Sequence, residues 1–254
     1  GQTLRLYTRV TQTPVRKESV SVKNANPSPR VIATIRNKPA AVSSNRAPAA
    51  EKSTGRYPQL ASGSALVVDA TTGQTLFSKN ADQTRSIASI TKLMTAMVAL
   101  DASPSMREVL SIGDEDVDYL KHTHSRLAVG TRLPRYDMLR LALMSSENRA
   151  ASSLSRHYPG GRQAFIRAMN NKAASLGMSH TRFYDPTGLT PSNISTAEDL
   201  AKMVRAAGRY DLIHEFTTTP EREVTLASGS ELQYRNTNAL VRDPSSNWNI
   251  QVSK

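Results

Sequence analysis

The chain has 254 residues, of which 38% are hydrophobic, no cysteine and a formal net charge of +12. Zero cysteines exclude disulfides and thiolate metal sites, and the lack of an 18-residue apolar run predicts no transmembrane segment. The charge suggests nucleic-acid binding, but residues 1–57 hold eleven Lys or Arg and two acidic residues, a net +9. The other 22 cationic and 19 acidic residues leave only +3, so we expect no nucleic-acid partner.

Residues 1–57 are rich in Pro, Ser, Ala, Asn and cations, without a sustained apolar period. Such a segment buries too little surface to offset the entropy of ordering. We expect a basic disordered tail or linker, followed by one folded domain at 58–254. The tail is either a solvated spacer or an electrostatic attachment to an anionic polymer or membrane surface. No signal-peptide core is visible near Gly1. The missing initiator Met suggests a processed or partial chain.

The first folded elements are a hairpin and a helix. Residues 64–80, "SALVVDATTGQTLFSKN", form two strand-like runs around a turn in which Gly73 supplies a positive φ. A helix is then predicted from Ser89 to about Asp101, where Ser-Pro-Ser stops it.

Three more helices and a strand-rich end follow. One helix precedes Ser146, a second is stopped by Gly177, and a third runs from a capping box at Ser195–Glu198 to Gly208. Residues 223–241 and 247–254 alternate like strands, the former around a turn at 228–230. The order predicts an α+β fold with a sheet interrupted by a helical insert.

Ser89 and Lys92 lie one helical turn apart on the same face. A serine hydroxyl is a poor nucleophile unless a base accepts its proton, and a neutral lysine amine one turn away would serve. Partial burial and a second cation nearby would both lower the lysine pKa enough. In isolation the spacing also fits a helix-capping serine followed by an exposed lysine.

Two later features strengthen the catalytic hypothesis. Ser146-Glu147-Asn148 lies at a corner between two predicted helices, where a hydroxyl and an amide can face a cleft. Lys254 ends the predicted strand "NWNIQVSK", where its charge would keep Lys92 partly deprotonated and attract a substrate carboxylate.

These residues carry a resemblance. Ser89-x-x-Lys92, Ser146-x-Asn148 and Lys254 stand in the order of the three motifs of penicillin-binding proteins and class A β-lactamases, the third being Lys-Thr-Gly. Residues 65–102, 141–161 and 176–189 further resemble the D-alanyl-D-alanine endopeptidases among the low-molecular-mass penicillin-binding proteins. The likeness covers roughly residues 60–254. It implies a β-lactamase/transpeptidase-like α+β fold, with an antiparallel sheet flanked by helices and a helical subdomain.

The resemblance also implies roles. Ser89 would be the acylated nucleophile, Lys92 its base, and Ser146 a proton relay to the leaving amine, whereas Asn148 and Lys254 would bind substrate. The protein would cut D-alanyl cross-links between peptidoglycan stem peptides in the periplasm and be acylated by β-lactams. No cofactor or metal is implied.

The third motif is incomplete, because the sequence stops at Lys254 before its Thr and Gly. The resemblance implies that the later strands of the sheet, the closing helix and the second oxyanion N–H are missing too. We expect a truncated domain that is misfolded or inactive as a 254-residue chain.

Several alternatives remain open. A D-Ala-D-Ala carboxypeptidase of the same fold differs in substrate only, and a non-catalytic wall-binding scaffold would keep the fold without the chemistry. A class A β-lactamase would need a Glu-x-x-Leu-Asn run after Asn148, which is absent.

Other polar motifs have simpler interpretations. His122-x-His124 could bind a metal, but no third ligand is evident. The acidic run Asp114–Asp118 is typical of a solvated face, and Asp185–Gly188 is interpreted as a structural turn.

Overall fold

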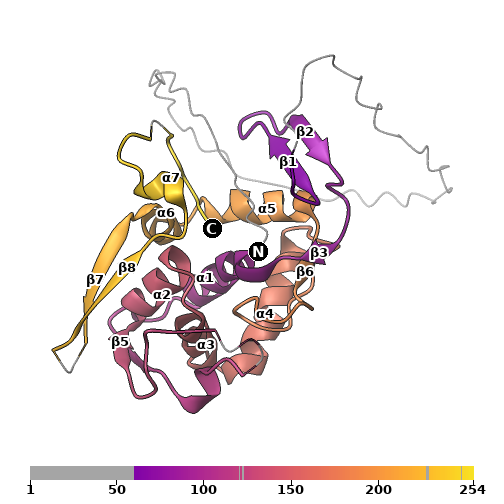
Figure 1. The fold of residues 1–254 in the computed structure, drawn as a ribbon. Helices are drawn as coiled ribbons and strands as arrows, with labels where there is room; N and C mark the ends of the chain where they lie inside the picture. The colour runs from indigo at the N-terminus through magenta and orange to yellow at the C-terminus, as the bar shows by residue number, and fades with distance from the viewer. Residues whose placement is uncertain (1–59, 120, 122, 227–228, 247) are drawn as a thin grey trace, which may run out of the picture. The chain divides into compact units, whose positions relative to one another are not determined.

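The structure is a computed structural model that describes residues 60–254, apart from 120, 122, 227–228 and 247 (Figure 1). The predicted basic tail at 1–57 lies outside the described residues, so this tail and its boundary stay predictions. Within the described part, no helix combines the length and the apolar character needed to cross a membrane.

Helix α1 (Thr91–Asp101) lies at the centre of the helical part (Figure 1). A single 3-10 turn, Ala88–Ile90, leads into it. Every residue from 91 to 99 is buried, as expected of a helix that is apolar on nearly all sides. The helices that contact α1 are α2 (Arg135–Met144), α3 (Asn148–Arg156), α4 (Gly161–Ser175), α5 (Ala197–Ala207) and α6 (Asp211–Thr218).

The strands of the described part form antiparallel pairs, and together with the helices they confirm the α+β class. They form four two-stranded ladders instead of one continuous sheet. The pairs are β1 (Ala65–Val68) with β2 (Thr75–Lys79), β3 (Arg85–Ser86) with β6 (Ile194–Ser195), β4 (Val109–Ser111) with β5 (Arg132–Pro134), and β7 (Glu221–Thr225) with β8 (Glu231–Arg235).

The β1–β2 hairpin confirms the first sequence prediction. Ala65 pairs with Lys79, and the register shifts at a bulge near Val68. Gly73 has φ of 76° in the turn, where a residue with a side chain would be strained. The carboxylate of Asp69 accepts hydrogen bonds from two backbone amides of the turn, which fixes its shape.

The predicted helices are present, with one corrected boundary. Helix α5 is capped by Thr196, whose Oγ1 accepts a 3.1 Å hydrogen bond from the amide of Asp199. The capping box expected at Ser195 is therefore wrong by one residue. Ser195 instead pairs in β6, opposite Arg85.

The C-terminal segment differs most from the prediction. Residues 239–242 form a short helix, α7 (Ala239–Arg242), because Asn238 caps it by accepting from the amide of Leu240 at 3.0 Å. Residues 248–254 form no strand. A strand requires a neighbouring strand for its backbone groups, and no described strand pairs with this segment.

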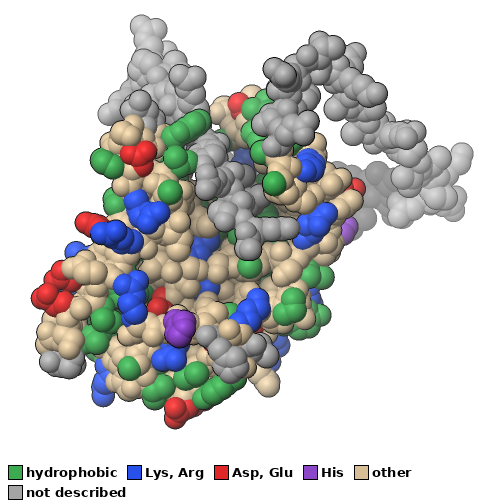
Figure 2. All heavy atoms as spheres, in the orientation of Figure 1, with side chains coloured by type: hydrophobic (Ala, Val, Ile, Leu, Met, Phe, Trp, Pro, Cys, Tyr) green, Lys and Arg blue, Asp and Glu red, His purple; other side chains and the backbone are tan. Residues whose placement is uncertain are grey.

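On the face shown in Figure 2, Lys and Arg side chains are interspersed with acidic ones. This mixed distribution agrees with the small net charge of the sequence after residue 57.

Candidate active site

The structure brings four of the five predicted site residues together. Ser89 Oγ lies 2.8 Å from Ser146 Oγ and 3.2 Å from Lys92 Nζ. Lys92 Nζ also donates a 2.7 Å hydrogen bond to Asn148 Oδ1. Ser89 lies in the 3-10 turn before α1, Lys92 in the first turn of α1, and the other two at the corner between α2 and α3.

Lys92 is fully buried, and its ammonium group meets only neutral oxygens. Its third partner is the backbone carbonyl of Thr187, at 2.7 Å. Burial lowers the pKa of Lys92 from 10.5 to about 7, although the charges of Asp185 and Glu147 partly raise it. A lysine with this pKa is neutral in a large fraction of molecules near neutral pH and can accept a proton from Ser89.

The capping alternative for the Ser89–Lys92 pair is wrong. The N-cap of α1 is Ile90, with no side-chain capping bond, and Lys92 is buried rather than exposed.

The backbone is strained at two residues next to Ser89, one that precedes it in the chain and one whose hydroxyl contacts it. Ala88 has φ of 45° and Ser146 has φ of 62°, values that residues with a side chain rarely adopt. Gly188 packs against the first of these positions, since a Cβ on Gly188 would lie 1.8 Å from the carbonyl oxygen of Ala88. The close approach of a glycine therefore holds the peptide that precedes Ser89.

The turn Asp185–Gly188 contacts the candidate site directly, a role beyond its expected structural one. The Asp185 carboxylate accepts from the amides of Thr187 at 2.6 Å, Gly188 at 2.5 Å and Thr190 at 2.7 Å. These bonds orient the Thr187 carbonyl toward Lys92. The turn chemistry of Asp-Pro-Thr-Gly signals the bend, but no sequence signal identifies which carbonyl meets a lysine 95 residues earlier.

A second overlooked residue supports Asn148. This residue is Thr123, whose Oγ1 accepts a 3.0 Å hydrogen bond from Asn148 Nδ2. The Thr123 hydroxyl in turn donates a 2.7 Å hydrogen bond to the carboxylate of Asp118. The nitrogen and the oxygen of the Asn148 side-chain amide therefore each have a partner, and Oδ1 is directed at Lys92.

The acidic run at 114–118 is not a purely solvated face. Asp116 is 4% exposed and forms ion pairs with Arg156 at 2.9 Å and Arg162 at 3.4 Å. Asp118 is also buried, under the Thr123 hydroxyl. Two of these carboxylates therefore hold the loop in place.

Lys254 occupies a position next to the cluster. Its Nζ donates to the carbonyls of Ala142 at 2.9 Å and Leu143 at 2.8 Å, in the last turn of α2. Burial and, second, the charge of Lys92 lower the pKa of Lys254 well below its usual value. Burial, rather than a second cation, is the main cause of the lowered Lys92 pKa.

The metal hypothesis at His122-x-His124 receives no support from the residues described. His122 lies outside them, and His124 is exposed. Within the described part of the chain, no group of three or more His, Cys, Asp or Glu residues is arranged to hold a metal ion.

Comparison with known proteins identifies the family. The D-alanyl-D-alanine carboxypeptidase family, peptidase S11, matches residues 50–254. This chain belongs to that family. The resemblance inferred from the three motifs is confirmed at the level of the family.

Named relatives and solved structures agree. The D-alanyl-D-alanine endopeptidase of Pseudomonas aeruginosa is 50% identical over 77% of this chain and 63% of its own length, and that of Escherichia coli K12 is 50% identical over 81% and 66%. The crystal structure of the Streptomyces K15 DD-transpeptidase matches with a TM-score of 0.69, at 28% identity over 75% of this chain and 79% of that one. The chain thus spans about two thirds of the length of the two endopeptidases.

Proposed function

We propose that this protein is a serine D-alanyl-D-alanine endopeptidase, which hydrolyses D-alanyl cross-links between peptidoglycan stem peptides through an acyl-serine intermediate. The observation that carries the proposal is the environment of Ser89. Its hydroxyl lies within hydrogen-bond distance of a buried lysine with a pKa of about 7 and of a second serine hydroxyl. That arrangement is an activated nucleophile.

Acylation begins when Ser89 Oγ attacks the D-alanyl carbonyl carbon while its proton passes to neutral Lys92. The C–N bond of the scissile amide then breaks, and the leaving amine needs a proton. Ser146 Oγ, 2.8 Å from Ser89 Oγ, donates it and is reprotonated from Lys92. The acyl group remains on Ser89 as an ester, and Lys92 is neutral again.

Deacylation repeats these steps with water. Water attacks the ester carbon and its proton passes to Lys92. The ester C–O bond then breaks, and Lys92 returns the proton to Ser89 Oγ, which leaves as the hydroxyl. Asn148 binds the substrate peptide and, through its 2.7 Å bond, fixes the position of Lys92.

Lys254 binds a substrate carboxylate in its protonated form, for which Nζ leaves the carbonyls of Ala142 and Leu143 in the last turn of α2. The approaching carboxylate favours the protonated form and offsets the lowering of the Lys254 pKa by burial and by Lys92.

The choice of an endopeptidase rests on the relatives. The two at 50% identity are named endopeptidases, whereas those named carboxypeptidases, such as DacF of Bacillus subtilis, are about 30% identical. A carboxypeptidase is the second candidate, favoured by the description of the family. Both reactions use the same acyl-serine chemistry and differ in whether the leaving group is a free D-alanine or the amine of a second stem peptide.

Substrate chemistry sets the location and the partners. Peptidoglycan lies outside the cytoplasmic membrane, so we place the protein in the periplasm as an exported protein. β-Lactams mimic the D-alanyl terminus and would acylate Ser89. The reaction needs no cofactor. The basic residues at 1–57 precede the catalytic domain at 58–254, as a spacer or as an attachment to an anionic surface.

A fluorescent penicillin tests the nucleophile. In a polypeptide that continues past Lys254 through the Thr and Gly of the third motif, we expect covalent labelling that maps to the peptide containing Ser89, and none after Ser89→Ala. Ser86→Ala, an exposed serine in the preceding strand, is the matched control and should label normally. Labelling of Ser89→Ala at the normal rate would contradict the proposal, because another residue would then be the nucleophile. Absence of labelling with Ser89 intact would favour a non-catalytic scaffold.

Mass spectrometry of products from purified cross-linked muropeptides tests the substrate. An endopeptidase releases monomers. Free D-alanine as the sole product would overturn the endopeptidase assignment in favour of the carboxypeptidase.

A further inference from the structure

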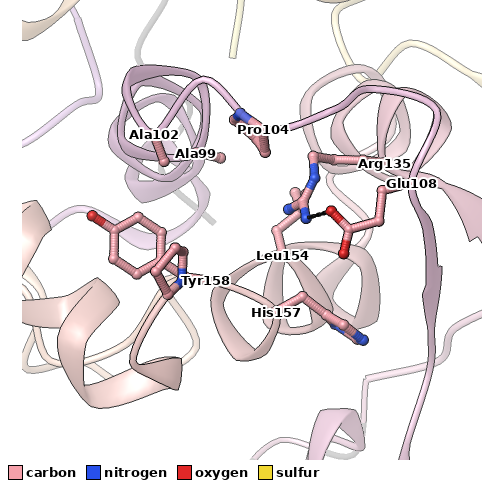
Figure 3. Close-up of a pocket in the computed structure, with 9 residues that line it drawn as sticks. Ala99, Ala102, Pro104, Glu108, Arg135, Leu154, His157 and Tyr158 are labelled. Carbon is pink, nitrogen blue, oxygen red and sulfur yellow. Dashed lines mark hydrogen bonds and ion pairs between the residues drawn. The ribbon is translucent and has the colours of Figure 1, made fainter.

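A cavity lies near the C-terminal end of α1 (Figure 3), whereas Ser89 precedes the N-terminal end of that helix. The cavity has a volume of about 320 Å³. Its walls expose polar and apolar surface in about equal parts, and two of its residues, Ala99 and Ala102, come from the last turn of α1 and its C-cap. The remaining residues that line it are Pro104, Glu108, Arg135, Leu154, His157, Tyr158 and Pro159. Lys92 lies seven residues before Ala99, roughly 10 Å along the helix axis, so this cavity is separate from the serine cluster.

One ion pair supplies the charge of this cavity. Arg135 Nη2 contacts Glu108 Oε2 at 2.5 Å, and the amide of Arg135 donates to the carbonyl of Glu108 at 2.7 Å. Both residues are therefore fixed relative to each other through backbone and side chain. In Figure 3 the guanidinium of Arg135 points into the cavity, and the ring of Tyr158 lines the opposite side.

Arg135 retains unused hydrogen-bonding capacity. It is 4% exposed, and its Nε is buried without a hydrogen-bond partner among the described residues. A buried guanidinium nitrogen without a partner is costly, because it has lost water without gaining an acceptor. The Glu108 side chain is 48% exposed, which leaves its carboxylate open to a further donor. The cavity thus presents a cation and an anion side by side.

We propose that this cavity binds a free α-amino acid with a small apolar side chain. Such a molecule carries a carboxylate and an ammonium on neighbouring atoms, which matches the short separation of Arg135 and Glu108. Its carboxylate meets the guanidinium and its ammonium meets Glu108, in two charge-assisted contacts. The side chain packs against the apolar wall of Leu154 and Tyr158. A dipeptide fits less well, because its terminal charges are separated by an additional residue.

This inference goes beyond the proposed peptidase activity and does not depend on it. The test uses the Ser89→Ala protein, in which no turnover consumes or releases an amino acid. Titration with D-alanine and with L-alanine is followed by the backbone amide signals of ¹⁵N-labelled protein. We expect saturable shifts with one or both enantiomers, concentrated at residues 99–108 and 154–159. Propionate, which lacks the ammonium, and alanine methyl ester, which lacks the carboxylate, should bind at least about 10-fold more weakly.

Three variants locate the contacts. Arg135→Gln and Glu108→Gln should each weaken alanine binding roughly 10- to 100-fold, the usual effect of losing a hydrogen bond to a charged group. Ala102→Leu fills the cavity from an exposed position and should abolish the shifts. Arg140→Gln is the matched control, because Arg140 is a similarly buried arginine on α2 that does not line the cavity.

Several results would overturn the proposal. They are the absence of saturable shifts with either enantiomer, unchanged affinity in Ala102→Leu or Glu108→Gln, and equal loss in Arg140→Gln and Arg135→Gln. Binding of propionate as tight as that of alanine would also overturn it. If Arg135→Gln does not fold, the two variants at exposed positions decide the question.

Discussion

Two buried cations, Lys92 on α1 and Arg140 on α2, have different surroundings. Arg140 Nη2 lies 3.0 Å from the carboxylate of Glu215 and 2.6 Å from the hydroxyl of Tyr136, and its guanidinium stacks over the ring of Phe216. Lys92 Nζ has three neutral oxygens at 2.7–3.2 Å and no carboxylate within ion-pair distance among the described residues.

The comparison shows how partners decide what a buried cation does. An arginine stays protonated at any physiological pH, and a carboxylate partner stabilises its charge. A lysine among neutral oxygens has lost its hydration without gaining a full counter-charge, so its pKa falls to about 7. The first arrangement holds two helices together, whereas the second gives a lysine with the pKa that the proposed base requires.

The largest effects should come from replacing each of the two cations, because the loss of Lys92 should slow the reaction and the loss of Arg140 should lower stability. Lys92→Met should slow acylation by a penicillin roughly 100- to 10,000-fold, the range for loss of a general base. Lys92→Arg should be nearly as slow, because arginine keeps the charge but does not release its proton. Arg140→Met should label at a normal rate and unfold at a lower temperature.

These variants are compared by stopped-flow labelling and thermal unfolding. Normal labelling of Lys92→Met would remove the distinction between the two sites.

Displacing the support of the nucleophile should have the next largest effect. In Gly188→Ala the new methyl group would collide with the Ala88 carbonyl and shift the peptide before Ser89. We expect acylation to fall about 100-fold, the usual cost of misplacing a reacting group by about 1 Å. Gly130→Ala is the control, with a similar φ of 87° and open space around its Cβ, and should change only stability. Equal labelling rates in both variants would contradict a positioning role for Gly188.

A carboxylate introduced next to Lys92 should make the surroundings of this lysine resemble those of Arg140. Asn148→Asp places an anion about where Oδ1 lies, 2.7 Å from Nζ, and should raise the lysine pKa. A rise of about one to two units slows acylation at pH 7 roughly 10- to 100-fold and moves the pH–rate profile to higher pH. Asn148→Ala controls for the lost substrate contact, and its profile should not move to higher pH. An unshifted profile in Asn148→Asp would argue against Lys92 as the base.

The smallest predicted effect is the change of the acylation rate with pH in the protein without substitutions. Below the Lys92 pKa of about 7, the neutral fraction grows about 10-fold per pH unit, and the acylation rate should grow with it before levelling off. The free energy of unfolding should also rise with pH. Between pH 7 and 10.5 the unfolded lysine keeps its proton and the folded one does not, so unfolding free energy rises by up to about 1.4 kcal/mol per unit. Lys92→Met should lose the rate dependence and the part of the stability dependence that Lys92 contributes. Lys254, whose pKa is also lowered by burial, keeps its own part.

Much of the site could be predicted from local sequence patterns. The i, i+3 spacing of Ser89 and Lys92 fixes their proximity once the segment is helical, and the Ser146–Asn148 corner follows from two helix boundaries. The partners of Lys92 in the turn 185–188 could not be predicted. They depend on tertiary packing across some 95 residues and on a backbone carbonyl, which has no side-chain signature.

Prediction of the fold from the sequence fails in the same way, where an element depends on distant partners. The hairpin at 64–80 and the long helices carry strong turn, capping and apolar signals, and they are present. The strand expected at 247–254 has no counterpart among residues 248–254, because alternation alone does not supply a pairing partner. The ion pairs of Asp116 cannot be predicted for a related reason, since only the fold brings Arg156 and Arg162 to it.

The most direct test of the account is the protonation of Lys92 itself. In protein labelled with ¹³C at lysine Cε, the Lys92 signal is assigned by its absence in Lys92→Met and followed over pH. The account predicts a titration midpoint near 7. A midpoint near 10.5, as for an exposed lysine, would show that Lys92 is charged when Ser89 reacts and would contradict its role as the base.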